Sequence, residues 1–407
     1  MKIRKAYKFR LKTNREQECL FQQFSGCCRF VWNLTWSLNE YRLDNHLPLI
    51  RYHESSWFLT LWKQSEEYGF LREAPSQALQ QTLKDLDRAI RDGFDKSQPL
   101  KRMPRYRKKG QHDSFRIPQG FKLEGNRVFL PKIGWLRFYR SRKIEGTPKN
   151  ITVSRRGDHW YISIQVEQEL ADPVHPSSSA VGIDMGVIRF ATLSDGTYLE
   201  PLNSFRDLEA KLAREQHKLA RKKKFSKNWH KQKSKIIRLH TRIADTRNDY
   251  LHKASTTISK NHAVVVLEDL RISNMVRSAK GTADNPGRNV RAKSGLNKSI
   301  LDQGWYEFRR QLEYKQLWRG GKVIAVPPQY TSQTCPRCGL VSKDNRTSQS
   351  SFKCQRCGYT ENADVVAAIN IKAVGQTVLA CGEDALATSV KQEPVGNREV
   401  SPLQVAI

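Results

Sequence analysis

Four cysteines form two closely spaced pairs in the last quarter of the chain. The segments CPRCG and CQRCG give the pattern C-x2-C-x15-C-x2-C, made by Cys335, Cys338, Cys354 and Cys357. Each C-x2-C turn presents two sulfur atoms on one side, and four thiolates are a common ligand set of Zn²⁺. Four protein ligands leave the metal no open position, so we expect a Zn²⁺ ion that stabilises the fold and takes no part in catalysis.

Three acidic residues stand where apolar segments begin or end. Asp184 ends the segment AVGID, Glu268 ends AVVVLE, and Asp364 is near the start of NADVVAAIN. Three converging carboxylates would bind one or two Mg²⁺ ions, and two ions about 4 Å apart activate a water and stabilise the leaving oxygen of a phosphodiester. Taken singly, the three acids are equally compatible with a turn, an ion pair with a nearby arginine, and a helix N-cap.

The chain is strongly basic. Its 71 Lys and Arg residues exceed its 40 Asp and Glu residues by 31. This charge predicts a polyanionic partner, and nucleic acid is the commonest polyanion inside a cell. An anionic membrane surface is the weaker alternative, because no strongly amphipathic basic helix with a Trp or Leu face stands out. Nine Trp, 13 Tyr and 16 Phe residues exclude a wholly disordered basic protein.

Neither a membrane span nor secretion is expected. The sequence contains no run of 18 apolar residues. Its first residues, MKIRKAYKFRLKTN, lack the apolar core of a signal peptide.

The densest positive charge lies in residues 211–242, which hold 13 Lys and Arg residues and one acidic residue. We favour a helix that packs on an apolar stripe and presents phosphate ligands on its other side. A solvated basic face is the alternative. The stripe consists of Leu208, Leu212 and Leu219. The candidate phosphate ligands are Lys222, Lys223 and Lys224.

Two further groups of basic residues are candidates for nucleic-acid contacts. In the segment PRYRKK, Arg105 and Arg107 flank a tyrosine, as expected for contacts to an RNA backbone with one stacked base. Basic residues around the cysteine pairs favour phosphate contacts and a merely solvated surface about equally. These are Lys343, Arg346, Lys353 and Arg356.

The elements that position these residues follow from the apolar patterns. Residues 1–12 predict a strand, and the capping-box spacing from Thr13 to Glu16 predicts the start of a helix. Residues 15–110 read as a helical region, and the short alternating segments of 113–168 predict a small antiparallel barrel completed by the N-terminal strand. Beyond 180 the patterns predict strands at 180–184, 188–193, 263–268 and 322–327, helices at 203–258, 301–319 and 363–374, and a mobile loop at 273–299.

The chain resembles TnpB, the RNA-guided nuclease of bacterial insertion sequences, which is related to the type V CRISPR effectors. The segments GIDMG, LEDL and NADVVAAIN occur in the order of this family, with the cysteine pairs placed before the last acid. The other matching segments are RFVWN, ALQQTLKDL, PRYRKK, LPKIGW, RNDYLHK and GWYEFRRQLEYK.

The resemblance implies a multidomain α+β chain with a RuvC-like, RNase H-type nuclease domain. In that family Asp184, Glu268 and Asp364 would be the catalytic acids that ligate Mg²⁺, and the four cysteines would be the zinc ligands. The implied domains are a wedge-type β-barrel (1–14 and 111–178), a helical recognition domain (15–110), the nuclease domain (179–331 and 361–375), a zinc ribbon (332–360) and a disordered tail (376–407). The loop after Asn274 would be a lid over the metal site.

The implied activity is an RNA-guided, Mg²⁺-dependent DNA endonuclease encoded by a transposable element. It would take a guide RNA from the transposon end and cut double-stranded target DNA next to a short flanking motif, in the bacterial cytoplasm at the nucleoid. Tyr52 and Gln80 lie in segments that resemble the flank-reading part of the family, and glutamine can pair with adenine in a major groove. A plain helix-surface role for Gln80 is about equally compatible with the sequence.

Other functions remain open from the sequence. A catalytically silent RNA-guided repressor or transposition accessory protein would use the same binding surfaces, but all three acids are present. A structural ribonucleoprotein component would have no use for these acids. A strand-transfer transposase would need a catalytic tyrosine beside a metal-binding histidine pair, and no His-x-His motif occurs. The sequence predicts no oligomeric state.

Overall fold

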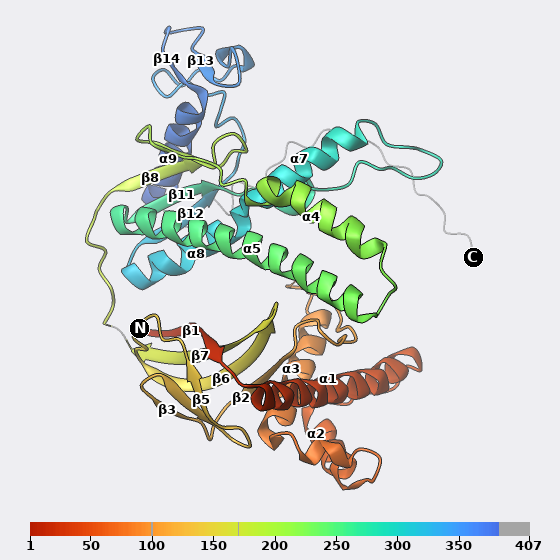
Figure 1. Cartoon of the computed structure of the whole chain (residues 1–407). Helices are drawn as coiled ribbons and strands as arrows, with labels where there is room; N and C mark the ends of the chain where they lie inside the picture. The colour runs from red at the N-terminus through yellow and green to blue at the C-terminus, as the bar shows by residue number, and fades with distance from the viewer. Residues whose placement is uncertain (99–100, 170, 382–407) are drawn as a thin grey trace. The chain divides into compact units, whose positions relative to one another are not determined.

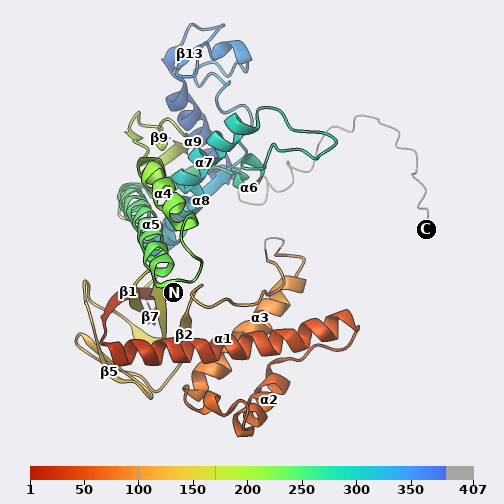
Figure 2. The same ribbon diagram turned by 45° about the vertical axis from the view of Figure 1, so that its right-hand side comes forward.

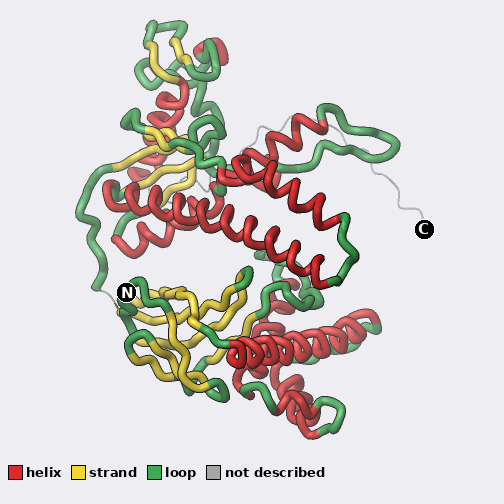
Figure 3. The backbone as a smooth tube through the Cα atoms, viewed as in Figure 1, coloured by secondary structure: helices red, strands yellow, loops and turns green. Residues whose placement is uncertain are grey.

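The computed structural model describes residues 1–98, 101–169 and 171–381 (Figure 1). The chain divides into two compact units. Unit 1 comprises Met1–Ala171 with Lys218–Thr241, and unit 2 comprises Asp172–His217 with the chain from Arg242 onward. Helices and strands occur in both units (Figure 3), so the predicted mixed α+β class is confirmed.

Unit 1 contains a seven-stranded antiparallel sheet in the order β2-β6-β7-β1-β5-β4-β3. The N-terminal strand β1 pairs with β7 along most of its length and with β5 at its end, so the prediction that it joins this sheet is confirmed. In the described residues the outer strands β2 and β3 do not pair with each other, so the sheet is open where a closed barrel was expected. The strands are β1 (Lys2–Lys12), β2 (Ser114–Ile117), β3 (Lys122–Glu124), β4 (Arg127–Leu130), β5 (Gly134–Phe138), β6 (Thr147–Arg156) and β7 (His159–Glu169).

The helices of unit 1 share one apolar core with this sheet. In α1, Phe21 packs edge-on against Trp160 of β7, with ring centroids 5.1 Å apart, and Phe24 packs against Phe115 of β2. This common core joins regions that the sequence suggested as separate recognition and barrel domains. The helices are α1 (Arg15–Asp44), α2 (Tyr52–Gln64), the 3₁₀ turn η1 (Gly69–Arg72) and α3 (Ser76–Phe94).

The first helix begins one residue later than the capping box predicted. The Asn14 side chain accepts a hydrogen bond from the Gln17 backbone N–H at 2.8 Å. The Gln17 side chain in turn accepts from the Asn14 backbone N–H at 3.2 Å. The reciprocal pair therefore uses Asn and Gln in place of Thr13 and Glu16.

Unit 2 is built on a five-stranded mixed sheet in the order β10-β9-β8-β11-β12. Strands β8, β11 and β12 run parallel, and β9 and β10 continue the sheet in antiparallel pairs. The predicted hairpin partner of the first strand is confirmed as β9. The strands are β8 (Ala180–Asp184), β9 (Ala191–Leu193), β10 (Tyr198–Leu199), β11 (Val264–Glu268) and β12 (Lys322–Val326).

The two faces of this sheet bury different residues. Val181, Ile183 and Leu267 face a core that includes Leu251 of α5 and Phe308 of α8. On the opposite face Val266 packs with Ile371 of α9. The helices of unit 2 include α4 (Ser204–Ala220), α5 (Lys227–Asn261), α6 (Ile272–Met275), α7 (Val290–Gln303), α8 (Trp305–Arg319) and α9 (Ala363–Cys381).

Three sequence-based boundaries are wrong. The helix expected over 203–258 is two helices, α4 and α5, joined by a turn at 221–226 (Figure 3). The loop expected over 273–299 contains α6 and most of α7. The last helix continues to Cys381, beyond the expected start of the tail at 376, and residues 382–407 lie outside the described chain.

Helix α9 is the one described helix long and apolar enough to cross a membrane by length and composition, with mean hydropathy 1.3 over Ala363–Ala380. This window escaped the sequence search because polar residues interrupt it. Ala368 and Ile371 are buried in unit 2, where α9 packs on the sheet. The core helix of a folded domain passes the same test, and we assign α9 that role.

Candidate functional site

The sheet of unit 2 brings Asp184 and Glu268 to the same edge. Strands β8 and β11 are parallel, and their last paired residues are Ile183 and Leu267. The next residue on each strand is the acid, so the two acids are lateral neighbours at the carboxyl ends of adjacent strands. Residues in register on parallel strands project from the same face, so both side chains leave the sheet on one side.

Helix α9 covers that side of the sheet and carries the third acid. A Cβ added to Gly182 of β8 would collide with the backbone of Ala368 and Lys372, so helix and strand approach closely here. Side chains alternate along a strand, which puts Gly182 and Asp184 on the same face. Asp364 lies one helical turn before Ala368, so all three acids gather on the α9 side of the sheet.

Neighbouring polar groups interact with two of the three acids, Glu268 and Asp364. Glu268 is 8% exposed and accepts a hydrogen bond from the Thr331 hydroxyl at 2.8 Å. The Arg346 guanidinium lies 3.8 Å from the Asp364 carboxylate. The side chain that caps α9 is Asn362, whose oxygen accepts from the Asp364 backbone N–H at 3.0 Å, so Asp364 itself lies in the first helical turn and is not the N-cap.

The carboxylates interact electrostatically. The pKa of Asp184 is raised from 3.8 to about 7, first by burial and then by the negative charges of Glu268 and Asp364. The positive charge of Arg346 opposes this rise in the pKa. Burial also raises the pKa of Glu268, and the hydrogen bond from Thr331 limits the rise. The site therefore concentrates negative charge in a poorly solvated place, as a cation-binding site does.

The oxygen atoms of the three carboxylates do not all lie within 4.8 Å of one another. Among the described residues, the four cysteines are the one group of three or more His, Cys, Asp or Glu whose ligand atoms all lie within 4.8 Å of one another. At least one pair of oxygens in the acidic triad is therefore further apart. The three acids share one face of the sheet, and the charges of Glu268 and Asp364 both act on Asp184.

A cavity of about 330 Å³ opens beside Glu268 in unit 2. Its lining includes Tyr306, Arg309 and Arg310 of α8, which the sequence reading did not single out as functional. Arg309 donates to Asp269, the neighbour of Glu268, at 2.7 Å. The two adjacent arginines of GWYEFRRQ were the one local signal, and both are paired with acids here, Arg309 with Asp269 and Arg310 with Glu307.

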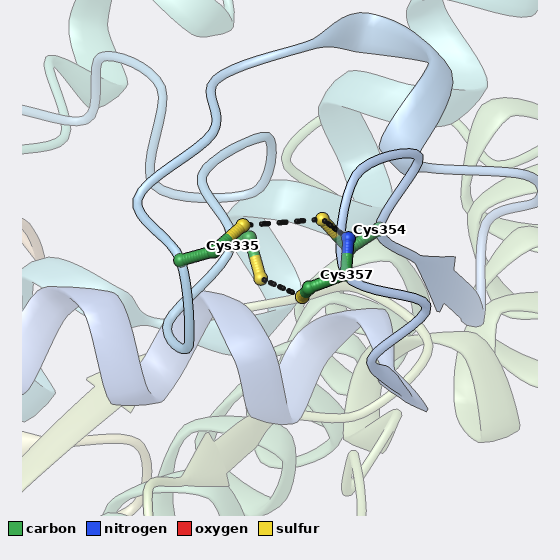
Figure 4. A group of neighbouring side chains, drawn as sticks. Cys335, Cys354 and Cys357 are labelled. Carbon is green, nitrogen blue, oxygen red and sulfur yellow. Dashed lines mark hydrogen bonds between the residues drawn. The ribbon is translucent and has the colours of Figure 1, made fainter.

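The four predicted zinc ligands converge. The Cys335 and Cys357 sulfur atoms lie 3.6 Å apart, and those of Cys338 and Cys354 lie 3.5 Å apart, with the sulfur atoms of the two turns facing one another (Figure 4). Tetrahedral Zn²⁺ with Zn–S bonds of about 2.3 Å requires sulfur separations of about 3.8 Å, so this set fits the ion closely. The hydrogen bond from the Cys357 backbone N–H lowers the pKa of Cys354 to about 6, which favours the thiolate ligand.

The cysteine cluster is built onto the start of α9. Its small core joins Phe352, Cys335 and Cys354 to Ala363 and Val366, the residues on either side of the Asp364 turn. The strands β13 (Ser351–Lys353) and β14 (Thr360–Asn362) form a hairpin that leads directly into the helix (Figure 2). A metal ion in the cluster would therefore fix the position of the third acid.

The segment at 105–107 is anchored on α1. The Arg107 guanidinium stacks 3.5 Å from the Trp32 ring centroid, and the Asn33 side chain pairs with both the backbone N–H and the carbonyl of Arg107. The Trp32 indole N–H donates to the Arg105 carbonyl at 3.0 Å. Burial lowers the pKa of Arg107. Arg107 thus has a structural partner, whereas the side chain of Arg105 is exposed.

The remaining predicted nucleic-acid residues lie at the surface of unit 1. Gln80 is exposed on α3, one turn before Lys84, whose ammonium lies 5.0 Å from the Tyr52 ring centroid. The geometry thus brings Gln80 and Tyr52 to the same side of α3. Lys222, Lys223 and Lys224 lie in the turn between α4 and α5 and not on a helix.

Family models describe a transposon-associated class of protein. Residues 163–279 match a family described as "Probable transposase", and residues 305–371 match "Cas12f1-like, TNB domain", which spans the four cysteines. Residues 1–43 match "Helix-turn-helix domain". In this structure those residues form strand β1 and one continuous helix, α1.

Relatives of known description place the chain within that class. It is 56% identical to the Escherichia coli K12 protein "Putative RNA-guided DNA endonuclease InsQ", over 97% of this chain and 98% of the relative. It is 32% identical to a Streptomyces pristinaespiralis protein named "Putative RNA-guided DNA endonuclease", over 96% of each. The chain therefore belongs to the TnpB/OrfB family, and the resemblance noted in the sequence is confirmed.

Solved structures are more distant. A Cas12f1–sgRNA–target DNA complex matches 91% of this chain and 99% of its own, at 17% identity and a TM-score of 0.33. A structure of the RNA-guided endonuclease CRISPR-Cas_phi3 matches 91% of this chain and 92% of its own, at 12% identity and a TM-score of 0.43.

Proposed function

We propose that this chain is an RNA-guided, Mg²⁺-dependent DNA endonuclease encoded by a transposable element, with a RuvC-like site that hydrolyses phosphodiester bonds. The observation that carries the proposal is the gathering of Asp184, Glu268 and Asp364 on one face of a mixed sheet, where burial and then the charges of Glu268 and Asp364 raise the pKa of Asp184 to about 7. The family relation supports it, because the relatives are named as RNA-guided DNA endonucleases.

The donor set suits Mg²⁺. Carboxylate oxygens are its preferred protein ligands, and a cation would offset both the burial of Asp184 and the repulsion from Glu268 and Asp364 that raise its pKa. Oxygens on one Mg²⁺ lie about 2.1 Å from the ion and so at most about 4.2 Å apart. The separation in the triad exceeds that limit for at least one pair. Three acids on a single ion would therefore require at least one of the side chains to move when the metal binds.

Bound Mg²⁺ would supply Lewis-acid activation of water and stabilisation of the leaving oxygen. The protein side chains orient the carboxylates and supply positive charge. Thr331 keeps the Glu268 carboxylate oriented. Arg346 supplies positive charge beside Asp364. Arg309 and Arg310 line a cavity on the α8 side of the sheet, at the carboxyl end of β11, where a nucleic-acid backbone that crosses this edge could contact them.

Guide RNA and double-stranded target DNA are the proposed partners, and the bacterial cytoplasm at the nucleoid is the proposed location. The excess of 31 positive charges supports polynucleotide binding. Sequence choice would come from base pairing between guide and target, next to a short flanking motif read by the protein. Arg105, Gln80, Lys223 and Lys224 are exposed and available for such contacts, and Lys222 is half-exposed.

The test is cleavage of a plasmid matched to a guide RNA, in the presence of Mg²⁺. Asp184→Asn keeps the shape of the side chain and removes its charge, so it should abolish cutting and leave guide RNA binding intact. Glu200→Gln, an exposed acid of the same unit, is the matched control and should cut normally. Undiminished cutting by Asp184→Asn would refute the assignment.

A catalytically silent, RNA-guided DNA-binding protein is the second candidate. The spacing within the acidic triad is the observation in its favour, because the carboxylates are not closed around a single ion position. This candidate predicts guide-dependent binding of the matched plasmid with no nicking at any Mg²⁺ concentration, in the wild-type protein and in Asp184→Asn alike.

A further inference from the structure

One exposed aromatic ring, that of Phe225, lies in the turn between α4 and α5, beside the half-buried ring of Trp229. Phe225 is 69% exposed, and its ring centroid lies 5.5 Å from that of Trp229 in the first turn of α5. Phe225 thus presents an apolar face to solvent at the tip of a helical hairpin. The ring is flanked by Trp229 and by the ammonium group of Lys224.

The backbone of Phe225 adopts a strained conformation. Phe225 has φ = 66°, in the left-handed region that bulky residues rarely adopt. The turn around it is nonetheless well made. The Ser226 hydroxyl accepts from the Trp229 backbone N–H at 3.2 Å, and the Ser226 backbone N–H donates to the Lys223 carbonyl at 3.1 Å. Strain held in a sparsely populated conformation is typical of ligand-binding sites.

The hairpin near the tip is anchored on its opposite side. Arg238 of α5 pairs with Asp158 in the β6–β7 turn at 2.6 Å, and Gly157 in that turn lies against Thr241. Gln232 and Ile236 are buried along the same stretch of α5. These contacts hold the part of α5 that follows Trp229 against the β6–β7 turn.

Lysines surround the two rings. The Lys224 ammonium lies 5.5 Å from the Phe225 ring centroid, and that of Lys233 lies 5.0 Å from the Trp229 ring centroid. The other exposed lysines near the tip are Lys223, Lys227, Lys231 and Lys235. Aromatic faces within a dense positive charge are the composition of single-strand-binding sites, where bases stack on rings and phosphates pair with lysines.

We propose that Phe225 and Trp229 form a stacking platform for an unpaired nucleobase of a single-stranded polynucleotide. The flanking lysines hold the phosphates on either side of that base. The platform goes beyond the proposed function, which requires only backbone contacts from this segment, and it rests on that function for the expectation that the strand is guide RNA.

The test compares the full-length protein on two short single strands of equal length, oligouridylate and the same ribose-phosphate backbone without bases. Wild-type protein should bind the base-bearing strand about five-fold or more tighter than the abasic strand. Phe225→Gly should remove this preference, and Phe225→Tyr should keep it. The slope of affinity against salt should stay the same in all three proteins, because the phosphate contacts are unchanged.

Two controls separate this outcome from misfolding and from the nuclease site. Phe225→Gly places glycine in the left-handed conformation and should not lower the thermal unfolding midpoint. Phe94→Ala removes another exposed aromatic ring, at the end of α3, and should keep the preference. Asp184→Asn should also keep it, so failure of the cleavage proposal and failure of the platform give different results.

The matching deoxyribose strands identify the source of the base. If the protein prefers base-bearing over abasic strands only when the backbone is ribose, the bound base belongs to the guide RNA. If this preference is equal or larger with a deoxyribose backbone, the base belongs to an unpaired strand of the DNA. Equal affinity of the wild-type protein for base-bearing and abasic strands of both kinds overturns the platform. An undiminished preference in Phe225→Gly, or a change only in its self-association, overturns it as well.

Discussion

The Thr331 hydroxyl donates a 2.8 Å hydrogen bond to the buried Glu268 carboxylate, across a gap of 63 residues in the chain. Thr331 is itself held by α9, because the Asn370 side-chain amide donates to its carbonyl at 2.7 Å. The same amide donates to the Thr334 carbonyl at 2.8 Å, next to the first zinc-ligand candidate. One side chain of α9 thus links the acid of β11 to the cysteine cluster.

Removing the Thr331 hydroxyl should weaken metal binding. Thr331→Val keeps the shape, deletes the hydrogen bond and thereby raises the pKa of Glu268 further, since this bond opposes the effect of burial. Partners of metal-ligating carboxylates typically contribute about 10- to 100-fold to affinity or activity. When cleavage is measured at increasing Mg²⁺ concentration, Thr331→Val should need more Mg²⁺ than the wild type or cut more slowly. Thr331→Ser, which keeps the hydroxyl group, should need nearly the wild-type concentration. Equal Mg²⁺ requirements in both variants would exclude the orienting role.

The acidic site should destabilise the metal-free protein at neutral and higher pH. The pKa of Asp184 is about 7 in the folded protein and 3.8 as its ordinary value in an unfolded chain. Between pH 3.8 and about pH 7 the folded state therefore binds more protons than the unfolded state, and the free energy of unfolding falls as the pH rises. The loss is at most about 4 kcal/mol. Asp184→Asn should therefore unfold at a higher temperature than wild type at about pH 8 with a chelator present, and at nearly the same temperature below about pH 4.

The measurement is thermal unfolding across pH, with Glu200→Gln as the matched exposed carboxylate. Saturating Mg²⁺ should narrow the gap between wild type and Asp184→Asn, because binding to the folded state adds stability to the wild type. A wild-type protein whose metal-free stability rises between about pH 4 and pH 7 relative to Asp184→Asn would contradict the charge arrangement described for the site.

Loss of Zn²⁺ should disable cleavage through α9. The cysteine core includes Ala363 and Val366, which flank Asp364, so unfolding of the cluster releases the third acid. Cys354→Ser should lower the zinc content, speed hydrogen exchange in the first turn of α9 and reduce cutting. Cys19→Ser, at an exposed cysteine of α1, should change none of these. Normal exchange in α9 after zinc loss would show that the helix is held independently.

The close contact of β8 with α9 should tolerate no added methyl group. A Cβ at Gly182 would meet the backbone of Ala368 and Lys372, which cannot move aside like a flexible side chain. Gly182→Ala should cost about 1–3 kcal/mol of unfolding free energy and lower cleavage by moving Asp364 away from Asp184. Gly295→Ala in α7 has open space at the same point and should be neutral or slightly stabilising. Denaturant unfolding of both variants tests the contrast.

Much of the candidate site could be predicted from sequence because its residues end or begin strongly apolar segments. Asp184 and Glu268 each end a short segment of mostly apolar residues. Such continuous apolar segments are typical of strands that are buried on both faces, so the two strands could be recognised. The lateral pairing of the two acids could not be predicted, since the register between strands 84 residues apart depends on packing. The roles of Thr331 and Asn370 depend on the same tertiary contacts and leave no local pattern.

The misplaced boundaries have physical causes too. Lysine is a good helix former, so the run before Phe225 predicts continuous helix, and neither glycine nor proline marks the turn. Helix α7 was missed because its Ser, Gly and Asn content is typical of loops. Tertiary contacts stabilise it instead, as Lys293 donates to the Met275 carbonyl and Asn297 to the Val276 carbonyl.

The central claim is that Asp184, Glu268 and Asp364 hold divalent cations against the scissile strand. Electron paramagnetic resonance of Mn²⁺ in the complex with guide RNA and a non-cleavable target tests it most directly. We predict two magnetically coupled ions, about 4 Å apart, in the wild-type protein and loss of the coupling in Asp184→Asn. Absence of bound Mn²⁺ in the wild type, or an unchanged signal in Asp184→Asn, would contradict the claim.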